Sequence, residues 1–320
     1  MRRRAFIALA TGVAAWPIAG FALSPGMATI GMLLVKSAGS EQLPQGLRRA
    51  LQSRGYVEGQ NVRFEVRSDE GSPNRLPDLA AELVRLKVDV IVTWYTPAAL
   101  AAKKTTSDIP IVMAMAGDPI DTGLVQSLAR PGGNVTGTAG VGAELAGKDV
   151  ELVRELLPAA HRITALVNAP DPFSKPFLET LRQAGAATRI TIDPIMLNGS
   201  AGLDAAFATM AKAPTDAVIV QPSLGLRQPV ALALQYRIPA LSVFREFVEA
   251  GGLMTLAVSE DDIYRSTARF VDNILKGAKP AELPVERPTL FKLVLNLKTA
   301  QALGLTFPRS LLARADEVIE

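Results

Sequence analysis

Short apolar runs alternate with longer amphipathic segments along the chain from residue 29 onward. Short apolar runs bounded by turn residues are typical of buried strands, and apolar positions at helical spacing are typical of helices that pack on a sheet. The alternation therefore predicts βαβ units built on a parallel sheet. The first series of expected elements is strand 30–35, helix 43–54, strand 61–67, helix 76–86, strand 88–93, helix 97–105 and strand 109–115.

A second series repeats this order: strand 163–168, helix 173–184, strand 188–192, helix 203–212, strand 217–220 and strand 240–244. Asp89 and Asp216 each open an apolar strand, and a helix and an Ile-Pro pair follow each of them. The repetition predicts an α/β fold of two doubly wound parallel-sheet lobes joined by a hinge. Open α/β sheets bind ligands beyond the carboxyl ends of their strands, so a cleft between the lobes is the expected site. Two independent domains without a shared site are the alternative.

A polar residue followed by proline recurs after four expected strands: Thr96-Pro97, Asp118-Pro119, Asp171-Pro172 and Gln221-Pro222. Threonine or aspartate before proline is typical of a helix start, so the first three pairs predict helix N-termini that face the cleft. The N–H groups of a helix start suit a ligand carboxylate, and an aspartate there suits a ligand ammonium. The alternative is that each of these side chains only caps its own helix.

Trp94 and Tyr95 follow directly after an expected strand, in a chain with few aromatic residues. They are candidates for the wall of a pocket that takes a flat or apolar ligand. Neighbouring strand residues point to opposite faces of a sheet, so at most one of the two is expected to face the cleft. The other is expected to pack under a helix.

The net charge of +3 resides at the N-terminus, because Arg2, Arg3 and Arg4 are the only charged residues before Leu23. The remaining 31 basic residues balance the 31 acidic ones, which argues against a nucleic-acid partner. The arginines and the uncharged run 5–22 predict an export signal peptide over residues 1–22, by the Sec or the twin-arginine route. A retained membrane anchor is the alternative.

Candidate catalytic chemistry is sparse. The chain has no cysteine and one histidine, His161, which we interpret as incidental. Neither a Gly-x-Ser-x-Gly elbow nor a phosphate-binding Gly-x-x-x-x-Gly-Lys loop occurs. We therefore expect no enzymatic activity, no cofactor and no metal, although an α/β scaffold alone does not exclude an enzyme. No run after residue 27 is long and apolar enough to span a bilayer, so the processed chain is expected to be soluble.

Six stretches spread over the chain carry a family likeness: residues 55–62, 96–103, 129–137, 244–254, 274–280 and 311–320. Through them the chain resembles the ABC-type substrate-binding proteins of the tryptophan/tyrosine-binding-like group, which share the type I periplasmic binding fold. The resemblance implies a monomeric periplasmic receptor that closes over a small solute, such as an amino acid or another small carboxylate. Such a receptor delivers its solute to an ABC permease and ATPase and contacts the membrane only through the permease. A sensor that reports to a membrane receptor or kinase is the alternative.

The resemblance also implies that the chain crosses between lobes three times. The first lobe is expected at 28–137 plus 259–285, and the second at 138–258 plus 286–320. Relatives usually carry glycine at the position of Tyr95 and a Ser-Tyr-Gly-Pro-Asp sequence at 255–259, so the pocket is expected to be reshaped here. The predicted ligand-binding residues are Lys36, Ser37, Trp94, Tyr95, Thr96, Asp118, Asp171, Phe173, Ser174, Gln221, Ser223, Phe244 and Ala257.

Overall fold

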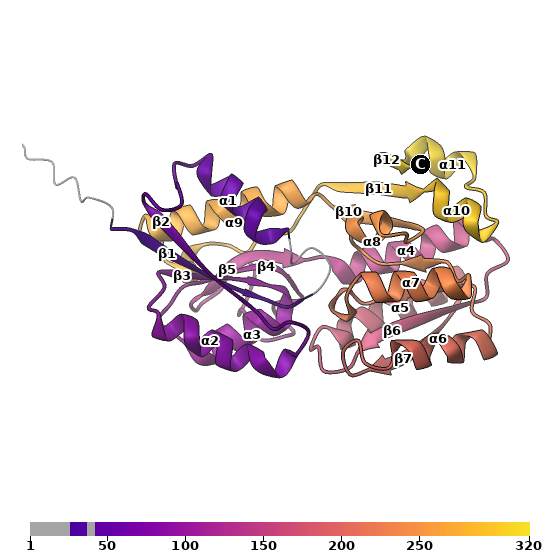
Figure 1. Ribbon diagram of the computed structural model, residues 1–320, viewed down its shortest axis with the longest axis horizontal. Helices are drawn as coiled ribbons and strands as arrows, with labels where there is room; N and C mark the ends of the chain where they lie inside the picture. The colour runs from indigo at the N-terminus through magenta and orange to yellow at the C-terminus, as the bar shows by residue number, and fades with distance from the viewer. Residues whose placement is uncertain (1–25, 37–41) are drawn as a thin grey trace, which may run out of the picture.

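The computed structural model describes residues 26–36 and 42–320 (Figure 1). The expected export signal and Ser37 lie outside the described residues. Two lobes lie side by side, one built on a five-stranded sheet and the other on a seven-stranded sheet. The predicted α/β fold with two parallel-sheet lobes is confirmed. No helix in the described part of the chain is long and apolar enough to cross a membrane.

The first sheet has the strand order β2-β1-β3-β4-β5 and is parallel throughout. Its strands are β1 (Ala28–Leu34), β2 (Val62–Ser68), β3 (Val90–Trp94), β4 (Ile111–Gly117) and β5 (Val135–Gly140). The helices of this part are α1 (Leu43–Gln52), the short 3-10 helix Pro73–Arg75, α2 (Leu76–Arg85) and α3 (Tyr95–Thr105). Strands β1, β3, β4 and β5 are almost entirely buried, as is typical of a sheet covered on both faces, whereas the edge strand β2 is mostly half-buried.

The second sheet has the order β12-β11-β10-β9-β8-β6-β7, and only the β10–β11 pair is antiparallel. Its strands are β6 (Arg162–Asn168), β7 (Thr191–Leu197), β8 (Ala217–Val220), β9 (Ala240–Leu241), β10 (Met254–Val258), β11 (Phe291–Asn296) and β12 (Glu317–Ile319). Its helices are α4 (Gly142–Leu156), α5 (Ser174–Thr188), α6 (Leu203–Lys212), the 3-10 helix Pro222–Leu224, α7 (Arg227–Tyr236), α8 (Arg245–Glu249), α10 (Leu297–Leu303) and α11 (Arg309–Arg314).

The sequence repeat corresponds to equivalent positions in the two sheets. Strands β6 to β10 take the same spatial order as β1 to β5. Asp89 accepts a hydrogen bond from the backbone N–H of Thr29 (2.7 Å), at the start of β1. Asp216 accepts one from the backbone N–H of Arg162 (2.9 Å), at the start of β6. The two aspartates therefore have the same task, which is to anchor the beginning of the first strand of each sheet.

The chain passes between the sheets three times: from β5 to α4, from β10 to α9 (Glu260–Leu275), and from the 3-10 helix Pro280–Glu282 to β11. Helix α9 returns to the first lobe, where it packs on α1 and over β3, β4 and β5 (Figure 1). Asp272 fixes it there, because its carboxylate accepts hydrogen bonds from Tyr56 Oη (2.9 Å) and Arg54 Nη1 (3.2 Å). The expected lobe bounds stay a prediction, and β5 continues in the first sheet to Gly140.

Candidate functional site

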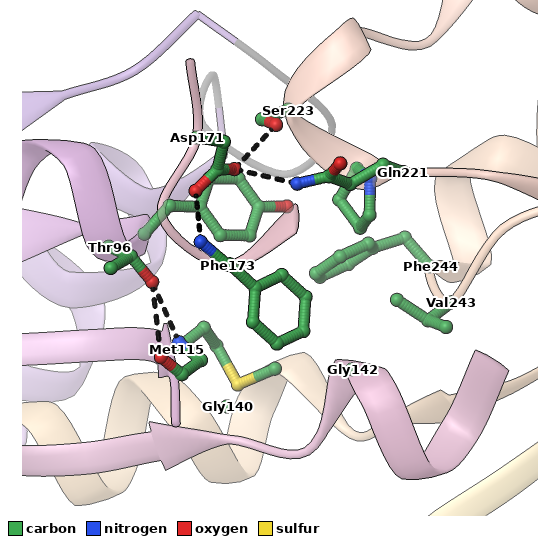
Figure 2. Close-up of a pocket in the computed structure, with 13 residues that line it drawn as sticks. Thr96, Met115, Gly140, Gly142, Asp171, Phe173, Gln221, Ser223, Val243 and Phe244 are labelled. Carbon is green, nitrogen blue, oxygen red and sulfur yellow. Dashed lines mark hydrogen bonds between the residues drawn. The ribbon is translucent and has the colours of Figure 1, made fainter. Parts of the chain in front are cut away.

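A pocket lies where the carboxyl ends of strands from both lobes meet. Strands β3, β4 and β5 reach it from the first lobe, and β6, β8 and β9 reach it from the second. The enclosed space is only about 20 Å³, which holds about one water molecule. The lining residues are Tyr95, Thr96, Met115, Gly117, Gly140, Gly142, Asp171, Phe173, Gln221, Pro222, Ser223, Val243 and Phe244 (Figure 2).

Asp171 is the centre of the polar wall of this pocket. It is 4% exposed, and its carboxylate accepts three hydrogen bonds (Figure 2). Oδ1 accepts from the backbone N–H of Phe173 (3.0 Å), while Oδ2 accepts from Gln221 Nε2 (2.9 Å) and Ser223 Oγ (2.7 Å). Gln221 Oε1 in turn accepts from the backbone N–H of Asn168 (2.9 Å), which orients the amide toward Asp171. Because β6 and β8 are adjacent parallel strands, the loops after them bring these side chains together.

The charge on the pocket wall is confined to Asp171. Among the described residues that line the pocket, no other side chain is ionisable at neutral pH. No lysine, arginine or histidine on the wall therefore balances the charge of Asp171. Burial raises the pKa of Asp171, and the hydrogen bonds from Ser223, Phe173 and Gln221 oppose that rise. A ligand ammonium placed against this carboxylate would favour its ionised form, because an opposite charge nearby lowers the pKa of an acid.

Thr96 does not cap its helix. Helix α3 begins at Tyr95 with Trp94 at the cap position and no side-chain cap. The Thr96 hydroxyl instead accepts from the backbone N–H of Gly117 (3.0 Å) and donates to the Gly117 carbonyl (3.3 Å), as Figure 2 shows. Thr96 therefore fastens the start of α3 to the end of β4, and its hydroxyl is already engaged within the protein.

The prediction that proline pairs mark helix starts is wrong at Asp118. Asp118-Pro119 opens a turn, in which Asp118 Oδ1 accepts from the backbone N–H of Asp121 (3.2 Å). At Asp171-Pro172 the helix begins three residues later, at Ser174. An aspartate that hydrogen-bonds the backbone just after it stabilises a tight turn as readily as a helix, and only tertiary packing decides between them.

Two wall residues have backbone conformations that favour glycine. Tyr95 has φ of 67° and Met115 has φ of 59°, both in the left-handed region. Met115 stands at a break in the β4–β5 register, and it lines the pocket. The left-handed backbone at residue 95 gives a physical reason for the glycine expected there in relatives. Strained backbone of this kind concentrates at functional sites.

Of the two neighbouring aromatics, Tyr95 lines the pocket and Trp94 does not. Trp94 is fully buried, and its ring centroid lies 5.3 Å from that of Tyr95. Tyr95 meets Phe244 of the second lobe edge-on, with 5.7 Å between the ring centroids. The expectation that one aromatic faces the cleft while its neighbour packs inside agrees with this arrangement.

The structure brings seven of the predicted residues onto the pocket wall: Tyr95, Thr96, Asp171, Phe173, Gln221, Ser223 and Phe244. Lys36 lies instead beside a neighbouring hollow, where Nζ pairs with Glu70 at 3.1 Å. Asp118 lies at another hollow, Ser174 begins α5, and Ala257 is buried in β10. The sequence reasoning missed the wall residues Met115, Gly117, Gly140, Gly142, Pro222 and Val243, of which Pro222 belonged to a noted motif.

Comparison with known proteins identifies the family. Residues 31–319 match the family described as ABC transporter substrate binding protein. The chain belongs to this family. The family resemblance inferred from the sequence is therefore confirmed, and the fold is that of the type I periplasmic binding proteins.

Individual relatives of this ABC substrate-binding protein match most of its length. A tyrosine-binding protein of Clostridioides difficile (strain R20291) is 27% identical over 278 residues, 85% of this chain and 79% of that protein. The structure of an ABC domain in complex with L-Trp from Streptococcus pneumoniae is 31% identical, with a TM-score of 0.85 over 91% of this chain and 99% of that one. A conserved domain protein from Vibrio cholerae is 28% identical, with a TM-score of 0.86 and the same coverage.

Metal binding finds no support in the described residues. Within residues 26–36 and 42–320, no group of three or more histidine, cysteine, aspartate or glutamate side chains is placed to hold a metal ion. The pocket instead combines one buried carboxylate, that of Asp171, with mostly apolar walls.

Proposed function

We propose that this protein is the periplasmic receptor of an ABC importer, and that it binds a small solute bearing an ammonium group between its lobes. The observation that carries the proposal is the buried Asp171 carboxylate, which has donors on three sides and no basic residue on the pocket wall. A buried acid without a countercharge is costly in a protein, and a cationic ligand group offsets that cost.

A carboxylate group of the same ligand would face the first lobe. Helix α3 begins at the pocket with Tyr95 and Thr96, so its first turn directs backbone N–H groups toward the cleft. Such a helix start favours a carboxylate. With the ammonium at Asp171 and the carboxylate at α3, one zwitterionic amino acid would join the two lobes.

Closure of the lobes is the proposed signal to the permease. The pocket takes residues from both lobes, and the three chain passages between the sheets are the places where such a molecule bends. A ligand that contacts both lobes stabilises the closed arrangement to the extent that it binds that arrangement more tightly than the open one. The solute is held and released unchanged, since the wall pairs no nucleophile with a histidine or lysine base.

A thermal-shift screen with the purified chain tests the binding part of the proposal. We expect amino acids to raise the melting temperature, because a ligand that binds only the folded state stabilises it by mass action. Uptake of the best amino acid by cells with and without the gene then tests the importer role. Lost uptake supports the importer, while unchanged uptake with a lost cellular response would favour the sensor.

A further inference from the structure

The ring of Phe173 fills part of the pocket between the lobes. Phe173 comes from the loop between β6 and α5 in the second lobe, and it is 8% exposed. Its ring lies against the first lobe at Gly117, where a Cβ atom would stand only 2.3 Å from Phe173 Cδ2. At Gly142 a Cβ atom would stand 3.5 Å from Phe173 Cζ. The ring therefore packs closely against both glycines, at positions where neither contributes a side chain.

The ring is held in this place from two sides. The backbone N–H of Phe173 donates to Asp171 Oδ1 (3.0 Å), so the carboxylate expected to bind the solute also fixes the residue that fills the cleft. The ring centroid of Phe177, in the core of the second lobe, lies 6.0 Å away. Moving Phe173 out of the cleft would therefore break contacts on both its backbone and its ring.

Little space is left once this ring is in place. Tyr95 and Phe244, which contact each other edge-on, also line the pocket, and the remaining volume is about 20 Å³. A small solute needs only a slight separation of the lobes to enter beside Asp171. A phenol or indole side chain is at least as large as the Phe173 ring itself, whereas the space left beside that ring holds only about one water molecule.

We propose that Phe173 is a specificity-determining residue that restricts the cleft to the smallest amino acids and excludes tryptophan and tyrosine. This inference rests on the proposed solute-binding function. The proposed selectivity distinguishes this chain from the tyrosine-binding relative and from the relative whose structure contains L-Trp. The physical basis is steric, because the ring of Phe173 occupies space that the ring of an aromatic ligand would need.

Isothermal titration calorimetry with glycine, L-alanine, L-serine, L-tryptophan and L-tyrosine tests the inference. The proteins are the wild type, Phe173→Ala and Phe173→Leu, with Phe177→Leu as the control. Phe177 lies in the same segment but is fully buried outside the pocket wall. We expect the wild type and Phe177→Leu to bind a small amino acid at least ~100-fold more tightly than tryptophan or tyrosine. Phe173→Ala should gain aromatic binding, and Phe173→Leu should fall between.

Tight binding of tryptophan or tyrosine by the wild type would overturn the role of Phe173 while leaving the receptor function intact. The wild-type ranking alone gives this answer, even if Phe173→Ala does not fold. Unchanged selectivity in a folded Phe173→Leu would also overturn it. Absence of binding by all five amino acids to every variant would overturn the proposed amino-acid receptor itself.

Discussion

Glu246 of α8 carries a carboxyl group that is buried at the boundary between the lobes. It is 6% exposed and faces Glu260, the first residue of α9. Burial and then the neighbouring Glu260 raise the pKa of Glu246 to about 9, with a smaller contribution from Glu249. Tyr264 Oη donates a hydrogen bond to Glu260 Oε2 (3.0 Å).

Replacing Glu246 with glutamine should stabilise the protein at neutral and basic pH. In the unfolded chain Glu246 ionises near pH 4.5, whereas in the folded chain it holds its proton to about pH 9. Folding therefore loses about 1.4 kcal/mol for each pH unit between these values. The loss of folding free energy reaches about 3 kcal/mol at pH 7. Glu246→Gln should therefore be more stable than the wild type at pH 7 by a similar amount.

Urea denaturation of the wild type and Glu246→Gln at pH 4.5, 7 and 8.5 measures this effect. The stability difference should be small at pH 4.5, where Glu246 is protonated in the folded chain and about half protonated in the unfolded chain, and should grow toward pH 8.5. Glu249→Gln, on the same helix but half-exposed and paired with Arg245, is the control, for which we expect a change below about 1 kcal/mol. A Glu246→Gln protein that is less stable than the wild type at pH 7, or equally shifted at all three pH values, would refute the reasoning.

Three further predictions concern the cleft. Thr96→Val should lower the free energy of unfolding by about 1–3 kcal/mol in urea denaturation, because the Gly117 N–H and carbonyl lose their partner; no loss would contradict the fastening role. Gly117→Ala should cost about 1–3 kcal/mol, because its Cβ would overlap the Phe173 ring, whereas Gly133→Ala, with open space around it, should not; equal effects would remove the steric argument. Affinity for an ammonium-bearing solute, measured by calorimetry, should weaken as the pH falls through the raised pKa of Asp171, because the carboxyl must lose its proton to pair with the ligand; an affinity independent of pH down to 4 would count against that pairing.

The regular βαβ parts of the fold could be predicted from the sequence because each apolar run is long and local. Helix 203–212 and strand 217–220 have the predicted bounds. Strand 240–244 is shorter than expected, since only Ala240 and Leu241 pair in the sheet. The acidic residues Glu260, Asp261 and Asp262 open a helix, as their sequence predicts, whereas strand β11 is not among the expected elements. The pairing of β11 with β10 and β12 depends on a chain crossing between the lobes, which no local sequence pattern encodes.

The candidate site was predictable as a place but not as a set of contacts. Asp171, Gln221 and Ser223 follow strands that end at one edge, so strand order was enough to bring them together. The partner of Thr96 is Gly117, at the end of a different strand, and nothing in the sequence near Thr96 indicates it. Phe173 narrows the pocket because its ring packs against Gly142 of its own lobe and Gly117 of the other lobe.

The most direct test of the account is calorimetric titration of the wild type, Asp171→Asn and Asp118→Asn with the amino acid that binds most tightly in the screen. Asp118 also follows a first-sheet strand end but lies outside the pocket. We predict one bound ligand per wild-type chain, unchanged affinity in Asp118→Asn, and an affinity about 10- to 100-fold weaker in Asp171→Asn, the loss of one charge-assisted hydrogen bond. Equal affinity in Asp171→Asn and the wild type would contradict the placement of the ligand between the lobes.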